Sequence, residues 1–367
     1  MKFSCARDII LKEISIAQEI ISSRNSLSIL SNVLLSASDG SLLIRATDLK
    51  VSFETRIPVD VKNNGSSTVF CDKLLGILRS LPEGEIEFEL AEGEKFIIRP
   101  LFKKIDFRLK SISADKFPEI ERAPVDSFFQ IAQADLNEMI SQTVFAVSDD
   151  ETRYFMNGVY LEKSEEHLVM VATDGRRLSY ISKIVGPDVP IFSGVIIPPK
   201  ILNMVRKLSS GEGQMMIAIN EKQVFFEFDN QKLSSALIEG QFPNYQRVIP
   251  ESQRYTVTVE RNELNEALKR VALLVEKSRR IYMNLATNSL TLLSEDGEIG
   301  IAKEEVACLY DGPEAKIALN FQYLSDPLKV ISDSEISIQY TETAKAISIF
   351  PIPAKDYFHI VMPMQMD

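Results

Sequence analysis

The 367-residue sequence is poor in the residues that build metal sites and disulfide frameworks. It has three cysteines, two histidines and no tryptophan. The cysteines Cys5, Cys71 and Cys308 are odd in number and far apart, and His167 and His359 are isolated from each other. No Cys-x-x-Cys or His-Glu-x-x-His spacing occurs. We therefore expect neither a disulfide scaffold nor a bound metal.

Long apolar runs and phosphate-binding loops are also missing. No run approaches the roughly 18 apolar residues that a membrane span needs. The segment Met1–Cys5 lacks the apolar stretch of a secretory signal. No glycine-rich loop follows a predicted strand and opens a helix, so no nucleotide site is visible. These absences predict a cytoplasmic protein without a membrane partner or a cofactor.

The sequence does contain one pattern three times. An apolar run, a turn with an aspartate and a second apolar run recur around Asp48, Asp174 and Asp296, at intervals of 126 and 122 residues. Two strand-like runs joined by such a turn are typical of a β-hairpin. Near-constant spacing indicates a tandem repeat, and about 120 residues is an ordinary domain size. The pattern therefore predicts three domains.

Each repeat also predicts two amphipathic helices, with apolar residues recurring every three or four positions. The first helix precedes the hairpin, and the second begins near Lys73, Lys200 and Tyr323 in the three repeats. Alternating runs after the second helix predict further strands. The two halves of each repeat resemble each other, which indicates a weaker internal duplication.

Domain boundaries are expected beside Pro124 and Pro250. The predicted domains are residues 1–125, 126–252 and 253–367. The fold class is α+β, and each domain has two helices packed on antiparallel sheet.

The three turn aspartates could serve as acids or bases, which would make the protein a hydrolase. However, an aspartate in a hairpin turn usually accepts hydrogen bonds from the backbone of the turn. The two isolated histidines add no catalytic arrangement. We therefore expect a protein without enzymatic activity.

The formal net charge of −11 argues against ordinary tight DNA binding through a basic surface. The charge can nevertheless be segregated. Acidic residues crowd strand-rich stretches such as 83–94, whereas many lysines and arginines lie on the predicted helices. Solvated helix faces commonly carry such cations, so the pattern is compatible with a basic face without establishing one.

Four motifs occur in order along the chain. They are Arg-Tyr-Phe-Met-Asn-Gly at 153–158, Ala-Thr-Asp-Gly-Arg-Arg-Leu at 172–178, Phe-Pro-Asn-Tyr at 242–245 followed by Arg247, and Val-Met-Pro-Met at 361–364. Together they resemble the bacterial sliding clamps, the β subunits of DNA polymerase III. The likeness runs from end to end, and three tandem domains of the DNA-clamp type are that family's architecture.

The resemblance implies a closed ring of two chains around double-stranded DNA, with helices lining the hole and sheets outside. Topology would then hold the ring on DNA, so weak and sequence-independent phosphate contacts suffice. Gln241 stands where the family often has arginine. The residues that the resemblance places next to DNA are Arg24, Lys73, Tyr154, Phe155, Lys200 and Arg206.

The resemblance also implies a hydrophobic groove between the second and third domains that receives short peptides of partner proteins. Those partners are the DNA polymerase III catalytic subunit, the clamp loader, and other DNA polymerases and repair proteins. Apolar walls with a few polar groups suit such a groove. The chain ends Gln365-Met366-Asp367, where relatives commonly place an arginine and an aliphatic residue. The residues carried over to the walls are Met156, Thr173, Gly175, Arg176, Leu178, Pro243, Arg247, Val248, Ile360, Met362, Pro363 and Met364.

For the homodimer, the resemblance places Phe107 and Leu109 of one chain against Leu273 and Leu274 of the other. The expected function is that of a clamp that tethers the replicative polymerase and confers processivity. The alternative is an acidic three-domain scaffold that binds peptides without encircling DNA. Only a closed ring would be released when circular DNA is linearised.

Overall fold

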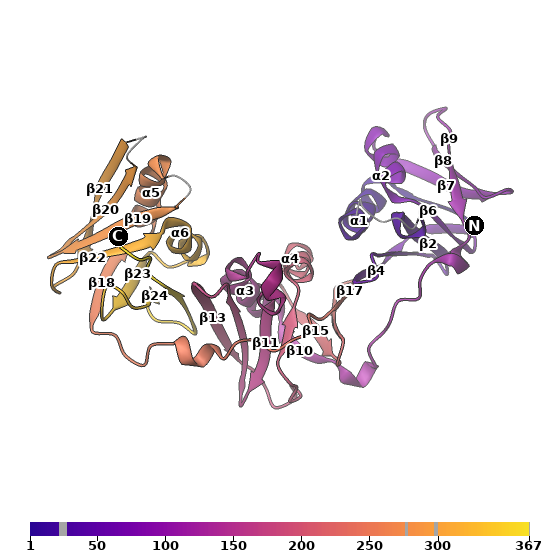
Figure 1. Ribbon diagram of the computed structural model, residues 1–367. Helices are drawn as coiled ribbons and strands as arrows, with labels where there is room; N and C mark the ends of the chain where they lie inside the picture. The colour runs from indigo at the N-terminus through magenta and orange to yellow at the C-terminus, as the bar shows by residue number, and fades with distance from the viewer. Residues whose placement is uncertain (22–27, 276–277, 297–299, 367) are drawn as a thin grey trace. The chain divides into compact units, whose positions relative to one another are not determined.

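The computed structural model describes residues 1–366 except 22–27, 276–277 and 297–299 (Figure 1). The chain divides into two compact units. Unit 1 comprises Met1–Ala132 with Glu212–Leu237, and unit 2 comprises Gln133–Gly211 with Ile238–Asp367. Each unit contains one long antiparallel sheet.

One pattern of a strand, a helix and three strands occurs six times in the described chain, twice in each predicted domain. The first domain adds a short strand, β5 (Asp60–Asn63), between its halves. Its two halves are β1 (Lys2–Ala6), α1 (Arg7–Ile20), β2 (Asn32–Ser38), β3 (Ser41–Thr47) and β4 (Val51–Pro58), and then β6 (Gly65–Phe70), α2 (Cys71–Ser80), β7 (Glu85–Ala91), β8 (Lys95–Pro100) and β9 (Phe107–Ile112).

The second and third domains repeat the same order. The second consists of β10 (Phe129–Ala132), α3 (Gln133–Thr143), β11 (Val159–Ser164), β12 (His167–Thr173), β13 (Arg177–Ile184), β14 (Val195–Ile197), α4 (Pro199–Leu208), β15 (Gln214–Ile219), β16 (Gln223–Phe228) and β17 (Gln231–Ala236). The third consists of β18 (Tyr255–Glu260), α5 (Arg261–Val271), β19 (Arg280–Ala286), β20 (Ser289–Asp296), β21 (Gly300–Leu309), β22 (Ala315–Asn320), α6 (Phe321–Val330), β23 (Glu335–Tyr340), β24 (Ile347–Ile352) and β25 (Tyr357–Val361). The predicted threefold α+β repeat is confirmed, and so is the duplication within each repeat.

Strand pairing crosses from one repeat to the next within each sheet. In the described residues of unit 1 the order is β10-β15-β16-β17-β4-β3-β2-β6-β9-β8-β7-β1-β5, so β17 of the second repeat pairs with β4 of the first. In unit 2 the order is β14-β11-β12-β13-β25-β24-β23-β18-β21-β20-β19-β22, so β13 of the second repeat pairs with β25 of the third.

The helices pack in pairs, α1 with α2, α3 with α4 and α5 with α6 (Figure 1). One apolar face of each helix is buried, as the predicted amphipathic pattern implies. In α1, for example, Ile10, Ile14 and Ala17 are fully buried against β3 and β4. Burying one such isoleucine contributes about 1.5–3 kcal/mol, because its side chain leaves water. Packing of this face, more than helix propensity, therefore holds each helix in place.

Two of the turn aspartates accept hydrogen bonds from backbone N–H groups, which is the structural role that the sequence predicts for them. Asp48 Oδ1 accepts the N–H groups of Lys50 (3.0 Å) and Val51 (2.7 Å). Asp174 Oδ1 accepts those of Arg176 (2.9 Å) and Arg177 (3.0 Å). Both carboxylates are thus committed to shaping a turn. The third turn, at Asp296, includes residues 297–299, which lie outside the described part of the chain.

His359 lies on β25 at the seam with β13 and is 1% exposed. Its Nδ1 is 3.0 Å from Ser179 Oγ on β13. Its Nε2 is buried and has no hydrogen-bond partner in the described part of the chain. Phe145 and Tyr357 contact the ring. Burial lowers the pKa of His359 to about 3, because the surroundings do not solvate an imidazolium ion.

This histidine predicts a loss of stability in acid. The unfolded chain takes up the proton near pH 6.5, whereas the folded chain resists it until about pH 3. Its effect is therefore absent above pH 6.5 and grows as the pH falls, reaching about 2 kcal/mol at pH 5. Urea unfolding at pH 7.5 and pH 5 checks this. In His359→Asn, which keeps a group near Ser179 but does not titrate, the loss should be smaller by about that amount. An equal loss in both proteins would contradict the prediction.

Candidate functional site

The turn between β12 and β13 favours a glycine at position 175. Thr173 Oγ1 accepts the N–H of Gly175 at 3.0 Å and donates to the carbonyl oxygen of Arg177 at 2.6 Å. Gly175 has a φ of 85°, a left-handed conformation that costs other residues energy. An added Cβ would also lie 3.0 Å from Arg153 Nη1. The tip of the Arg153 side chain therefore lies close to the position that a side chain at 175 would occupy.

Arg177 anchors this turn to its surroundings. Its Nε binds Asp174 Oδ2 at 3.0 Å, its Nη1 binds Asp326 Oδ2 on α6 at 2.7 Å, and its Nη2 donates to the carbonyl of Phe145 at 2.7 Å. The guanidinium also lies 4.7 Å from the centroid of the Tyr323 ring. Because these side chains are nearly buried, the charge network holds the turn rigidly to the third repeat. Sequence reasoning missed this role, since nothing in the Arg176-Arg177 pair indicates which arginine turns inward.

The floor of the predicted groove is the ladder between β13 and β25. Leu178 pairs with Ile360 across it, and both belong to a buried apolar cluster with Val169, Val171 and Ile196. Leu178 is 3% exposed and Ile360 is 2% exposed. An incoming side chain can thus reach them only if a neighbouring side chain moves.

The connection from β17 to β18 covers this cluster. Phe242 and Tyr245 insert into it, and Phe242 stacks on Tyr160 with ring centroids 4.8 Å apart. Tyr245 donates to Glu162 Oε1 at 2.6 Å, and Tyr160 donates to Glu162 Oε2 at 3.1 Å. Burial and the Glu162 carboxylate raise the pKa of both hydroxyls, that of Tyr160 to about 12. The connection is therefore fixed to β11 through Glu162, which accepts a hydrogen bond from each of the two neutral phenols.

The exposed part of the groove is built by the short helix η6 (Tyr245–Val248) and the residues after β25. Val248 is 52% exposed and Met362 is 42% exposed. The backbone N–H groups of Met362 and Met364 donate to the carbonyls of Arg176 and Ala318, both at 2.8 Å. The structure thus brings the turn, η6 and the C-terminal segment into one unit.

The other predicted groove residues differ in accessibility. Arg176 and Arg247 are exposed, and Pro243, Pro363 and Met364 are half-buried. Met156 and Thr173 are buried, at 5% and 8% exposure. Arg176 and Arg247 therefore supply the positive charge beside the apolar surface of Val248 and Met362.

Five of the six predicted DNA neighbours are described. Lys73 on α2 is exposed, as are Lys200 and Arg206 on α4. Tyr154, on the short helix η5 (Glu151–Met156), is 53% exposed. Phe155 packs against the buried apolar cluster that includes Leu178 and Ile360, so much of its ring is in contact with that cluster. Arg24 lies outside the described residues.

The four predicted interface residues are partly accessible. Phe107 and Leu109 on β9 are half-buried. Leu273, on the short helix η7 (Ala272–Leu274), is 80% exposed, and Leu274 is half-buried.

The described residues show neither a metal-binding cluster nor a membrane-spanning helix. No group of three or more His, Cys, Asp or Glu side chains is arranged to hold a metal ion. No described helix is both long and apolar enough to cross a membrane.

Comparison with known proteins covers nearly the whole chain. Residues 1–121, 130–244 and 246–365 match the models of the N-terminal, central and C-terminal domains of the DNA polymerase III beta subunit. The beta sliding clamps of Treponema pallidum (strain Nichols) and Escherichia coli (strain K12) are 48% and 30% identical to it, each over 100% of both chains. A crystal structure of the sliding clamp (DNA polymerase III subunit beta) from Pseudomonas aeruginosa bound to griselimycin has a TM-score of 0.93 at 31% identity, with 100% of both chains covered. The chain therefore belongs to the DNA polymerase III beta subunit family, the beta sliding clamps.

Proposed function

We propose that two copies of this chain close head to tail into a ring that encircles double-stranded DNA and tethers the replicative polymerase. The protein is then a non-catalytic processivity subunit without a cofactor, working on the chromosome in the cytoplasm. The proposed domain boundaries are those that the sequence predicts, near residues 125 and 252. The observation that supports the ring is a pair of strand edges that lack a pairing strand along part of their length, one in the first domain and one in the third.

The first open edge is on β9. Residues 107–110 pair with β8 on one side, whereas β6 pairs with β9 only at Ser111 and Ile112. Among the described residues, no strand pairs with the other edge of 107–110. The second open edge is on β21, where residues 300–307 pair with β20, and where, in the described part of the chain, β18 pairs only with Cys308 and Leu309.

Such edges expose unpaired backbone groups and are usually blocked or joined to another strand. Apolar residues accompany both edges, including Phe107 on β9 and the 67%-exposed Ile301 on β21. Lys110 lies on β9 and Glu305 on β21, so the two edges carry residues of opposite charge. If β9 of one chain paired with β21 of the other, the unpaired backbone groups of both edges would be hydrogen-bonded. Two such joints, related by a two-fold axis, close a ring.

Replacing Leu273 and Leu274 together by alanine should convert dimers to monomers, because it removes apolar surface beside the second edge. Native mass spectrometry at micromolar concentration measures the change. Ile191→Ala, which alters a 92%-exposed isoleucine elsewhere, is the control that should stay dimeric. If the unmodified chain is monomeric under these conditions, the ring is wrong.

DNA contact is assigned to the helices. Lys73 and Lys200 are exposed on α2 and α4 of two different repeats. Exposed cations on a surface that faces phosphates give weak binding that permits sliding, while closure of the ring prevents escape. The net charge of −11 is compatible with this arrangement, since affinity is not what retains the protein.

On nicked circular DNA, the loaded protein should survive salt that screens phosphate contacts and should leave when the circle is cut. Lys73→Glu with Lys200→Glu should reduce loading several-fold without affecting dimerisation, because phosphate attraction is reversed. Lys62→Glu with Lys345→Glu, the same charge change away from the helices, should load normally. Equal retention on linear DNA with free ends would favour the acidic scaffold instead.

The groove is proposed as the docking site for peptides of the polymerase III catalytic subunit, the clamp loader and other polymerases and repair proteins. Val248 and Met362 offer apolar surface, and the Gly175 turn, which has no side chain of its own, lets a peptide backbone approach once the tip of Arg153 turns aside. Met362 is flexible and unbranched, so we expect it to move and admit an anchor to Leu178 and Ile360. Two buried anchors at about 1.5–3 kcal/mol each supply about 3–6 kcal/mol, so backbone and charge contacts have to supply the rest of the roughly 8 kcal/mol that a micromolar affinity needs.

Deleting residues 362–367 should abolish binding of a polymerase-derived peptide while sparing the dimer, since it removes the flexible wall. Gly175→Val should do the same through its strained backbone and lost space. Deleting only residues 366–367 is the control that should still bind. Isothermal titration calorimetry decides between outcomes, and binding by the longer truncation within about twofold of the intact chain would exclude this groove.

A further inference from the structure

A second site in the chain has the same backbone arrangement of turn and paired strands as the groove, and we call this arrangement the frame. In the first repeat, Thr47 Oγ1 accepts the N–H of Leu49 at 3.0 Å and donates to the carbonyl of Val51, the pattern found at Thr173. The N–H of Ala236 donates to the carbonyl of Lys50 at 2.8 Å. That bond corresponds to the one from Met362 to Arg176, 126 residues later. Each frame thus has a turn, a strand pair and a backbone bond that ties the end of the second strand to the turn.

The connections that cover the two frames are also alike in sequence. Residues 117–122 read Phe-Pro-Glu-Ile-Glu-Arg, and residues 242–247 read Phe-Pro-Asn-Tyr-Gln-Arg. Arg122 is therefore the counterpart of Arg247. Likewise, Lys50 is the counterpart of Arg176 at the turn. Both frames retain two basic positions.

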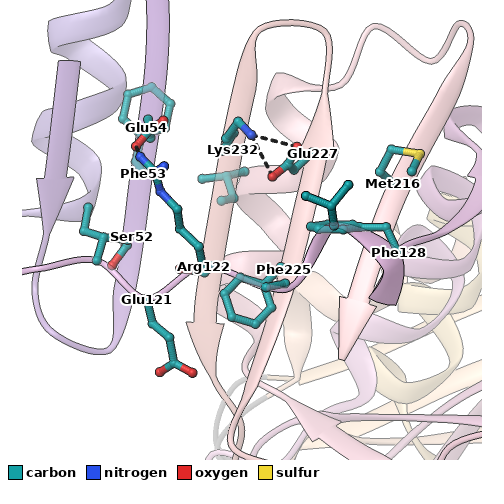
Figure 2. Close-up of a pocket in the computed structure, with 15 residues that line it drawn as sticks. Ser52, Phe53, Glu54, Glu121, Arg122, Phe128, Met216, Phe225, Glu227 and Lys232 are labelled. Atoms are coloured by element: carbon teal, nitrogen blue, oxygen red, sulfur yellow. Dashed lines mark hydrogen bonds and ion pairs between the residues drawn. The ribbon is translucent and has the colours of Figure 1, made fainter. Parts of the chain in front are cut away.

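The frame of the first repeat borders a cavity of about 280 Å³ within unit 1 (Figure 2). Phe128, Met216 and Phe225 form its apolar walls, and Ser52 and Ser234 lie on the paired strands β4 and β17. This volume is just below that of ordinary ligand pockets, which span roughly 300–1,000 Å³. It has room for one or two side chains of an extended segment.

The lining of the cavity differs from that of the groove on the paired strands and at the turn. Ser52 and Ser234 stand where the groove has Leu178 and Ile360, because both strand pairs have the same register. At the turn, Leu49 replaces Gly175; it has a φ of 75° and is 61% exposed. The cavity is therefore more polar and less open at the turn than the groove.

Among the charged residues that line the cavity, Arg122 is the cation with the weaker ion pair, and the neighbouring carboxylate of Glu121 accepts hydrogen bonds from Asn220 (3.3 Å) and Gln223 (3.0 Å). Lys232 binds both carboxylate oxygens of Glu227 at 2.9 Å. Glu54 is held at 2.6 Å by Arg45, and Arg122 only approaches it at 3.4 Å. The Arg122 side chain is 70% exposed. A carboxylate from outside can therefore bind this guanidinium without displacing a strong ion pair.

We propose that this cavity is a second peptide-docking site, which takes an extended acidic segment of a partner protein. One apolar side chain of the segment enters between Phe128, Met216 and Phe225, and a flanking carboxylate binds Arg122. The inference rests on the proposed function in one respect, namely that the shared frame is a peptide-binding frame.

Methionine methyl NMR of the full-length protein tests the site, because each frame has its own reporter. Met216 lines the cavity, whereas Met362 and Met364 belong to the groove. The probe is the synthetic peptide acetyl-Asp-Glu-Leu-Glu-Asp-amide, and its control is acetyl-Asn-Gln-Leu-Gln-Asn-amide. The acidic peptide should shift the Met216 signal saturably, and the neutral one should bind at least about tenfold more weakly.

Two matched variants separate this site from the groove. Arg122→Gln should weaken the Met216 response about tenfold, with recovery in Arg122→Lys, whereas Arg247→Gln should leave it unchanged. Shifts of Met362 and Met364 alone would overturn the second site and leave the groove standing. An undiminished response in Arg122→Gln would overturn the carboxylate contact. A Met216 signal that follows protein concentration, and not peptide, would make the cavity an interface between copies of the chain.

Discussion

The structure depends on main-chain pairing between strands of consecutive repeats. Strand β4 pairs with β17, and β13 pairs with β25, in the same register. Each repeat would otherwise present a bare sheet edge at these positions, with unpaired N–H and C=O groups. The pairing removes these edges, and it also brings a turn, a strand end and a connecting segment together. Both the groove and the cavity therefore occur where one repeat continues into the next.

Much of this arrangement could be predicted from the sequence, because its signals are local. Apolar stripes such as that of Ile10, Ile14 and Ala17 fix the helices, and the spacing of Asp48 and Asp174 fixes the turns. Local patterns do not state which strands of different repeats become neighbours. For that reason, the partnership of β17 with β4 and the cavity beside it were not expected.

Side chains that serve two elements were the least predictable part of the site. Arg177 and its neighbour Arg176 look equivalent in sequence, yet only Arg177 binds Asp174 and Asp326. Phe155 stands next to the exposed Tyr154, yet it packs on the groove cluster. His359 gives no sequence signal of its burial, since its environment comes from β13 and from Phe145. In each case, the role depends on a contact with a residue that is distant in the chain.

The anchoring of the last described residues has a practical consequence for handling the protein. Backbone bonds from Met362 and Met364 fix the direction in which the chain leaves β25. Any purification tag fused to the C-terminus begins within five residues of Met362 and next to the Arg176 turn. The opposite end is also confined, because the N–H of Leu90 binds the carbonyl of Met1, and a Cβ at Gly65 would lie 2.9 Å from that of Met1. An internal tag in an exposed turn far from both ends, such as the one around Glu165 between β11 and β12, would leave both ends unaltered.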